Sequence, residues 1–372
     1  MTELLEASAA AAAVAARLAD DAERQRRLPE ATSAAIRDAG LYRMLVPRSL
    51  GGEEVGLVEM IEALEILGAA DGSAAWCAMV AATAGLSLAH LEPDAAHEVF
   101  AGPETVIVGV FAPRGRAERR GAELRLSGRW PFGSNVLNAD WVLGGCLIEG
   151  SDRPRLVLMR RSEVEVIDTW RVAGLRGTGS HDFAVEELVV PASRAADTAA
   201  APFEDGALYA VPMLATLALG IAAVAIGIAG AAIDEFVVLA SAKVPTGSRR
   251  RLAEREVVQA AVARSRGEVR AARALLLSEA AAAWSEATAQ GEIGTPRRAA
   301  LRIAATHAAN AAVRATDEVF SHAGASSIYE TSTLQRRFRD THVAAQHLMV
   351  APPTYELAGR VELGLEVEGR GL

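Results

Sequence analysis

Cysteine and histidine are scarce in this sequence, and their scarcity excludes disulfide frameworks and metal clusters. Among 372 residues there are two cysteines, Cys77 and Cys146, which form neither a framework nor a ligand cluster. The seven histidines are scattered, and the spacing of His342 and His347 does not put both on one helix face. We therefore expect no metal site and a reducing compartment. The N-terminus lacks a basic start followed by a compact apolar run, so we expect a cytoplasmic protein.

Positive charge and aromatic side chains are also in short supply. The chain has 38 Lys and Arg against 47 Asp and Glu, a net charge of −9, whereas nucleic-acid binding generally requires a basic surface. We therefore expect no nucleic-acid partner. Aromatic residues make up 5% of the chain and hydrophobic residues 51%, with many alanines. This composition favours helices that pack closely through small side chains around a large core.

Charge is absent altogether from residues 207–233, a run long enough to cross a bilayer. Both flanks are acidic, at 204–205 and 234–235, and no Lys or Arg nearby would orient the run in a membrane. Its glycines suit close contacts between helices; they are Gly220, Gly227 and Gly230. We interpret the run as the central helix of a bundle, buried on all sides, and expect no membrane association.

The periodicity of apolar residues divides the chain into three regions and a tail. Residues 1–105 predict an N-terminal α-helical domain, in which either Asp71 or Ser73 caps one helix. Residues 106–203 contain alternating β-type runs separated by glycines and prolines, which indicates a small antiparallel β-barrel domain. Residues 204–351 predict a C-terminal four-helix bundle, and 352–372 form a tail that the pattern does not place. The fold class is thus mainly α with a β domain.

Two helix starts in the last region are specific enough to test. Thr295 followed by Pro296 predicts a helix capped by Thr295 and ended by Gly324. The next helix is expected from Thr331 to His347, before two prolines.

On that last helix, Arg336, Asp340, Val343 and His347 would share one stripe. Arg336 and Asp340 are spaced for an i, i+4 ion pair, while His347 is two turns from Asp340 and free to face another group. Local sequence leaves two interpretations open: a surface helix with one ion pair, or part of a functional site.

Common catalytic and nucleotide-binding signatures are absent. The segment Gly177-Thr-Gly179 is glycine-rich but leads into a strand and lacks the third glycine of a dinucleotide fingerprint. No phosphate-binding Walker loop, HExxH zinc motif or GxSxG nucleophile motif occurs.

Four segments, in the expected order, resemble the acyl-CoA dehydrogenase superfamily over the whole chain. They are Asp71-Gly-Ser-Ala-Ala-Trp76, Gly128-Arg-Trp-Pro-Phe-Gly-Ser134, Trp170 to Ser180, and Arg339-Asp340 with Gln346-His347. The first, second and fourth are more similar to the branch of flavin-dependent monooxygenases that includes two-component hydroxylases of 4-hydroxyphenylacetate and of steroid-derived phenols. A second possibility is a protein of the same fold that has lost flavin and acts as a scaffold for protein contacts. The clustering of these motifs argues against it.

The resemblance implies an enzyme that uses reduced FAD or FMN, supplied by a separate NAD(P)H-flavin reductase, together with O2. In that branch a flavin C4a-hydroperoxide hydroxylates an aromatic, polycyclic or natural-product substrate. By the same resemblance Ser134 lies near flavin N5 and His347 near the reactive edge, as catalytic residues. Ser134 as an ordinary turn residue is the alternative.

The resemblance also assigns residues to flavin and substrate. Phe111, Trp130, Phe132 and Arg176 are expected in the flavin site, although the two aromatic residues of the Gly128 motif could be core residues instead. Ser248 and Arg249 match the segment that reaches a neighbouring subunit's flavin phosphate, which implies a homotetramer; a solvated arginine run is the alternative. Trp76 is expected near the substrate.

A true acyl-CoA dehydrogenase is the main competing hypothesis. Enzymes of that kind carry a catalytic carboxylate in a Tyr-Glu-Gly-Thr motif, and this chain has Tyr329-Glu330-Thr331 without the glycine. Glu330 would then abstract an α-proton from an acyl-CoA, or otherwise lie near the substrate.

Overall fold

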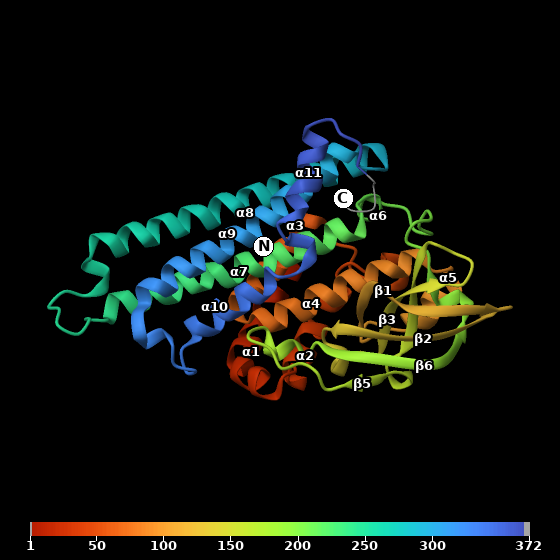
Figure 1. Ribbon diagram of the computed structural model, residues 1–372, viewed down its shortest axis with the longest axis horizontal. Coiled ribbons are helices and arrows are strands. Elements are labelled where there is room, and N and C mark those ends of the chain that lie inside the picture. The colour runs from red at the N-terminus through yellow and green to blue at the C-terminus, as the bar shows by residue number, and fades with distance from the viewer. Residues whose placement is uncertain (1, 368–372) are drawn as a thin grey trace.

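The computed structural model describes residues 2–367, which form a helical body with a β-sheet at one end (Figure 1). Five helices precede the sheet: α1 (Glu3–Gln25), α2 (Glu30–Asp38), α3 (Leu57–Ala70), α4 (Gly72–Gly85) and α5 (Pro93–Val99). After the sheet come a short helix and the long bundle: α6 (Ala207–Ala210), α7 (Met213–Ala242), α8 (Glu256–Gln290), α9 (Thr295–Ala323) and α10 (Thr333–Ala344). The last helix, α11 (Pro353–Glu362), lies in the segment that the sequence pattern did not place, and packs against α9.

The sheet has seven strands in the order β5-β6-β2-β1-β3-β4-β7. Their bounds are β1 (Ile107–Arg120), β2 (Glu123–Gly133), β3 (Trp141–Ile148), β4 (Pro154–Arg160), β5 (Glu165–Ile167), β6 (His181–Pro191) and β7 (Ala195–Ala196). All neighbours are antiparallel except β1 and β3, which run parallel. The expected combination of helices with a mostly antiparallel β domain and a bundle is confirmed.

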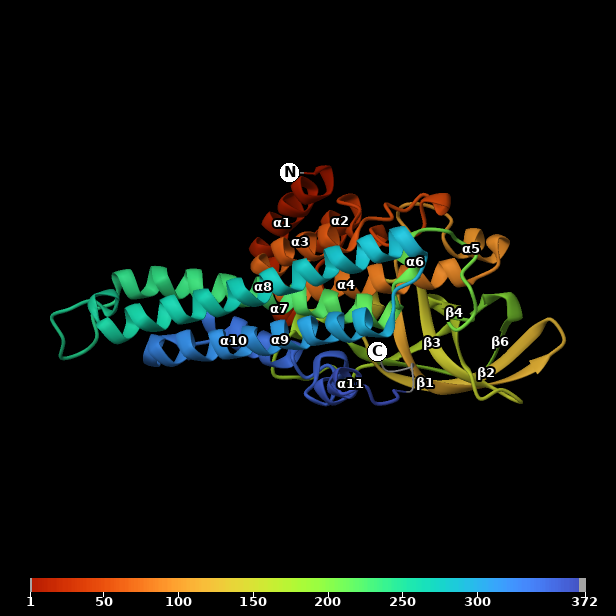
Figure 2. The same ribbon diagram turned by 90° about the horizontal axis from the view of Figure 1, so that it is seen from above.

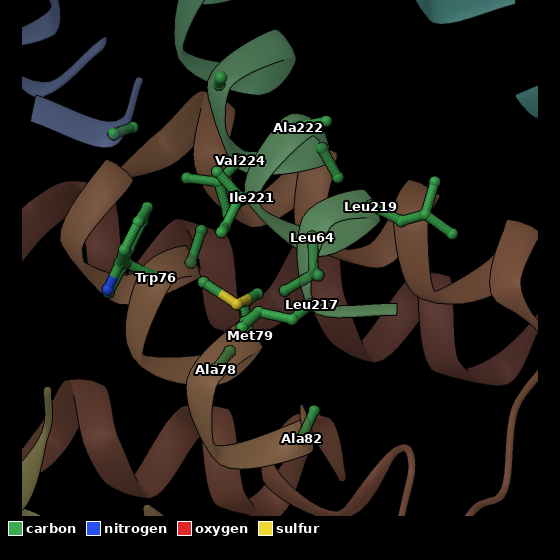
Figure 3. Packing of buried hydrophobic residues seen from close by; sticks show 14 of the residues in the cluster. Leu64, Trp76, Ala78, Met79, Ala82, Leu217, Leu219, Ile221, Ala222 and Val224 are labelled. Atoms are coloured by element: carbon green, nitrogen blue, oxygen red, sulfur yellow. The ribbon is translucent and has the colours of Figure 1, made fainter. Parts of the chain in front are cut away.

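The charge-free run forms most of α7, the central helix of the bundle. By length and composition α7 and the segment Gly72–His90 are both apolar enough to cross a membrane, but 89% and 94% of their most apolar windows are buried inside the fold. Figure 3 shows α7 packed on α3 and α4 through Leu64, Met79 and Ile221. The helix therefore contributes to the core of the molecule, as its sequence predicted.

Close helix contacts explain two of the three glycines in the run. A Cβ at Gly220 would come within 2.6 Å of Met79 Cγ, and one at Gly227 would collide with the carbonyl of Glu65. Both positions therefore require glycine for the packing distance. The expectation is wrong for Gly230, where a Cβ would meet no described atom within 4 Å.

Three local predictions need correction. Gly294, rather than Thr295, occupies the N-cap of α9, and Thr295 is already helical. The helix α10 ends at Ala344, so His347 is not on it and does not continue the stripe of Arg336 and Asp340. The cause is a tightened last turn, in which Gln346 N bonds Val343 O and His347 N bonds Ala344 O.

The expected ion pair between Arg336 and Asp340 is also wrong, because each side chain has a partner on another element. Arg336 pairs with Asp20 on α1. Asp340 instead accepts a hydrogen bond from the backbone N–H of Leu175 at 2.6 Å, in the loop between β5 and β6. Both side chains of α10 thus join the bundle to other parts of the fold.

Candidate active site

A chain of buried hydroxyl groups joins α4 to the β domain. Of the two expected caps, Asp71 is the one that caps α4: it accepts from Ala74 N at 2.6 Å, which fixes the start of the helix that carries Trp76. Trp76 Nε1 donates to Ser134 Oγ at 3.1 Å. Ser134 Oγ lies 2.7 Å from Ser180 Oγ. In Figure 3 the indole nitrogen of Trp76 points away from α7, out of the apolar cluster.

The direction of these hydrogen bonds follows from Thr178, the last residue in the chain of hydroxyl groups. Thr178 Oγ1 donates to Leu175 O at 2.8 Å, so it accepts from Ser180, 2.7 Å away. Ser180 must then accept from Ser134, because its own proton is already donated. Ser134 Oγ therefore donates inward, accepts from Trp76 and retains one lone pair for a ligand. The structure makes Ser134 an acceptor toward the site.

The loop that carries Ser180 and Thr178 is fastened by α10. Arg339 donates to Ala173 O, and Asp340 accepts from Leu175 N at 2.6 Å. Leu175 has a left-handed backbone with φ 50°, and Gly174 packs directly on the Arg339 carbonyl, where a Cβ would collide. Burial raises the Asp340 pKa to about 7, because the low-polarity interior disfavours the carboxylate.

His347 closes the other side of the site, from the turn after α10. It caps the 3₁₀ turn Leu348–Val350, where its Nδ1 accepts from Met349 N at 3.2 Å. Its ring meets Trp76 edge-on with centroids 5.9 Å apart. Because Nδ1 is an acceptor, the neutral ring carries its proton on Nε2. Burial lowers the His347 pKa to about 4, helped by the charge of Arg302, so the ring is neutral at physiological pH.

The residues expected to form flavin walls are in different surroundings. Phe132 ends β2 with φ 67° and is 67% exposed, with Trp170 as an edge-on neighbour. Phe111 is half-buried in an irregular part of β1, between the residues where its pairing with β3 shifts register. Arg176 is half-exposed and binds Val172 O and Glu23. None of these contacts tests whether Phe111, Phe132 and Arg176 bind flavin, so their assignment to the flavin site stays a prediction.

Trp130 is the exception, and the structure corrects its assignment. Its ring is fully buried inside the β domain, stacks on Phe183 with centroids 5.1 Å apart, and donates to Gly145 O at 2.8 Å. A Cβ at Gly128 or Gly144 would come within 2.7 Å of the indole, so both glycines shape its pocket. With no exposed surface, Trp130 is a core residue beneath the site and does not line it.

Ser248, Arg249 and Glu330 lie apart from the cluster of Trp76, Ser134 and His347. Ser248 and Arg249 belong to the exposed loop between α7 and α8, at the end of the bundle farthest from the sheet (Figure 1, Figure 2). Glu330 is exposed in the turn before α10. Lys243 donates to Ala323 O at 2.6 Å, which joins the ends of α7 and α9 near this turn.

Sequence reasoning missed three polar residues of the site region. Ser180 and Thr178 lie in a quoted motif, but only the folded loop shows that they are linked to Ser134. Arg302 on α9 is 3% exposed, and neither Nε nor Nη1 has a hydrogen-bond partner among residues 2–367. The available signal was an arginine in an alanine-rich helix, which periodicity alone does not separate from a surface residue.

A separate hollow of about 460 Å³ lies on the β domain. Its lining is strongly charged and comes from strands β1, β2, β3 and β6 and the loop after β3, including Arg116, Glu118, Arg125 and Glu187. None of the residues that form the Trp76, Ser134 and His347 cluster lines it. We therefore base the active site on the hydrogen-bonded cluster and not on this hollow.

Comparison with known proteins shows the family to which the chain belongs. The family patterns for the acyl-CoA dehydrogenase N-terminal and C-terminal domains match residues 4–92 and 219–352. Indole-3-acetate monooxygenase of Pseudomonas putida is 32% identical and covers 92% of this chain and 89% of its own. The oxygenase component of an FADH2-dependent resorcinol hydroxylase from Rhizobium sp. is 28% identical, over 94% of this chain and 91% of its own. The chain belongs to the monooxygenase branch of the acyl-CoA dehydrogenase superfamily.

Solved structures of the family have the same architecture. XiaF from Streptomyces sp., in complex with FADH2 and glycerol, superimposes with a TM-score of 0.92 at 27% identity, covering 100% of this chain and 97% of that one. The 3-HSA hydroxylase of Rhodococcus sp. RHA1 shares the fold with a TM-score of 0.93 at 24% identity, covering 100% and 99%. The predicted reaction class, an oxidoreductase of the flavin-dependent monooxygenase type, is confirmed by this membership, and with it a flavin cofactor.

Proposed function

We propose that this protein is the oxygenase component of a two-component system, which hydroxylates an aromatic small molecule with reduced FAD and O2. The observation that carries the proposal is the junction of Trp76, Ser134 and His347, where a β-domain hydroxyl and a neutral imidazole meet on two sides of one indole. The aromatic substrates and FADH2 in the names of the relatives support the same chemistry.

The residues of the site fit a reduced flavin. Bound reduced flavin supplies the two electrons that activate O2 for transfer of one oxygen atom. The spare lone pair of Ser134 Oγ suits an N–H donor such as N5 of the reduced ring. Phe132, 67% exposed, offers an apolar face to an aromatic ring system.

His347 would hold a proton where oxygen reacts. Its Nε2–H is a neutral donor, and its depressed pKa keeps it neutral while oxygen chemistry proceeds at physiological pH. Trp76 and the apolar surface beneath it exclude water from that side. Exclusion of water and retention of the proton both favour oxygen transfer to substrate over release of hydrogen peroxide.

The acyl-CoA dehydrogenase alternative fits the structure less well. Its base would be Glu330, which is exposed in a turn near the joined ends of α7 and α9. A base that abstracts an α-proton needs a site from which water is excluded, whereas the Glu330 carboxylate is exposed to water. The oxygenase hypothesis instead uses the buried cluster.

We also propose the partners and state of the enzyme. A separate NAD(P)H-dependent reductase would supply the flavin, because related proteins are named as oxygenase components or subunits. A cytoplasmic homotetramer would allow the exposed loop with Ser248 and Arg249 to reach a neighbour's flavin phosphate, a group that an Arg fork binds well.

The test uses purified protein titrated anaerobically with FADH2 and, in parallel, with reduced FMN. We expect tighter binding of FADH2 and, after mixing with 18O2 and a panel of phenols and indoles, a product that carries one labelled oxygen atom. Indole-3-acetate is the first member of the panel because it is the substrate in the name of a relative. Failure of both flavins to bind would favour the flavin-less scaffold, and bleaching of bound oxidised flavin by an acyl-CoA would favour the dehydrogenase.

A further inference from the structure

Arg302 is a buried cation for which residues 2–367 provide no hydrogen-bond or ion-pair partner. The residue is 3% exposed, and its Nε and Nη1 lack hydrogen-bond partners among residues 2–367. Burial lowers its pKa to about 10, so the guanidinium remains charged at neutral pH. An unpaired charge inside a protein is strongly unfavourable, and native folds retain one where it meets a ligand.

The helical repeat shows which way Arg302 faces. Phe320 and Asp317 lie on the same stripe of α9 as Arg302, because five full turns separate Phe320 from it. Phe320 stacks on Phe338 of α10 with centroids 4.3 Å apart, and Asp317 lies 3.3 Å from His342 of α10. The stripe therefore faces α10 and, farther along, the turn after it.

His347 belongs to that turn, so Arg302 and His347 face the same region. The electrostatics agree, since the charge of Arg302 contributes to the lowered pKa of His347. The turn Leu348–Val350 also contacts α9 directly. Arg302 thus lies on the same side of the site as His347, on a helix of the bundle.

Thr306, one turn after Arg302, adds a second unpaired group to the same face. Its Oγ1 is buried and has no hydrogen-bond partner among residues 2–367. At i, i+4 the two side chains are neighbours on the helix surface. Together they offer N–H donors and an O–H donor in a largely apolar interior, where hydrogen bonds to an anion are strong.

We propose that Arg302 and Thr306 bind the carboxylate of an aromatic substrate and so place its ring beside His347. This assignment rests on the proposed monooxygenase function and narrows its substrate to aryl acids. A planar carboxylate matches the Arg fork, which donates two parallel hydrogen bonds. A neutral phenol would leave the guanidinium uncompensated, which gives the site a preference for acids.

The experiment compares an acid with its neutral isostere. Indole-3-acetate, phenylacetate and benzoate are titrated calorimetrically into the full-length protein holding FADH2, without oxygen, each beside its amide. We expect the wild type to bind at least one acid more than tenfold tighter than its amide, since a charge-assisted pair is worth roughly 10- to 100-fold. Arg302→Gln should remove that preference and leave amide affinity within about twofold.

Arg314→Gln is the matched control, because Arg314 is on the same helix but half-exposed and paired with Glu268. It should leave acid and amide binding unchanged. Circular dichroism and thermal melting confirm that Arg302→Gln is folded, and Arg302→Lys provides a second variant that should recover part of the acid preference.

Two results would overturn the assignment: equal binding of acids and amides by the wild type, or an acid preference that persists in folded Arg302→Gln. The proposed function has its own readout, the transfer of labelled oxygen. If neutral phenols are hydroxylated but acids are not preferred, the Arg302 assignment fails while the monooxygenase function stands. If acids are preferred but no substrate gains oxygen, the binding role of Arg302 stands and the monooxygenase function fails.

Discussion

The two sides of the candidate site handle their polar groups differently. On the β-domain wall, formed by Ser134, Ser180 and Thr178, every hydroxyl is hydrogen-bonded within the protein. On the bundle wall, formed by His347, Arg302 and Thr306, the buried donors of Arg302 and Thr306 lack partners among residues 2–367. A network in which every hydroxyl is hydrogen-bonded keeps the protein rigid, whereas buried donors without a partner lower stability unless a ligand binds them. The comparison teaches which side is scaffold and which side recognises substrate.

The largest effect should follow loss of the donor on the bundle wall. His347→Ala removes the Nε2–H, and we expect coupled hydroxylation to fall by roughly 100-fold, as for loss of a positioned acid–base group. Product and hydrogen peroxide are measured together for each flavin oxidised. His342→Ala is the control, because His342 is on α10 and pairs with Asp317 outside the site. Equal coupling in both variants would remove His347 from the chemistry.

The next largest effect concerns Asp340, which accepts a hydrogen bond from the loop that carries Thr178 and Ser180. The Asp340 pKa is about 7 in the fold, above its ordinary value near 4, so ionisation opposes folding. Stability from this group is complete below about pH 4 and declines as pH rises toward 7. Between pH 5 and 8 we expect a loss of about 2–3 kcal/mol in unfolding free energy, from ~1.4 kcal/mol per pKa unit.

Asp340→Asn should abolish that slope, because the amide oxygen still accepts from Leu175 N but does not ionise. Urea unfolding at several pH values measures it. A slope that is the same in Asp340→Asn and wild type would mean that another group causes it. Glu256→Gln, at an exposed carboxylate, controls for general charge effects.

Much of the fold is readable from sequence because it depends on local patterns. The missing charge in 207–233 identified the central helix. The start of α4 was recognised, with Asp71 as one of two possible caps, because that pattern is contained in a few residues. The turn at His347 was missed, as were the partners of Arg336 and Asp340 on other elements of the fold. These depend on which distant element offers a hydrogen bond, and one-dimensional periodicity does not contain that information.

The same reasoning explains what was found and missed in the site. Motifs pointed to Trp76, Ser134 and His347, and the structure brings these three side chains together in contacts that the motifs did not specify. Trp130 was assigned to the flavin for its aromatic ring, but three glycines leave room for it inside the sheet. Arg302 was missed because its burial and its lack of a hydrogen-bond partner among residues 2–367 are visible only in the packed structure.

A smaller effect should follow a break within the β-domain wall. Ser180→Ala leaves the Ser134 hydroxyl and Thr178 Oγ1 each short of one partner, and we expect unfolding free energy to fall by about 1–2 kcal/mol. Flavin affinity should fall with it, since Ser134 is then free to rotate. Ser241→Ala, on the exposed face of α7, serves as control in the same urea titrations. A wall that tolerates Ser180→Ala without loss would not be a hydrogen-bonded scaffold.

The smallest effect is of opposite sign and tests the bundle wall. Thr306→Val keeps the side-chain shape and removes a buried, unpaired hydroxyl, so we expect unfolding free energy to rise by about 0.5–1 kcal/mol. Thr316→Val, at another buried and unpaired hydroxyl of α9, should give a similar gain. Only Thr306→Val should also weaken aryl-acid binding, because Thr316 lies roughly 15 Å farther along the helix axis than Thr306. If both variants gain stability and bind acids equally well, Thr306 is an ordinary packing defect and the carboxylate is held by Arg302 alone.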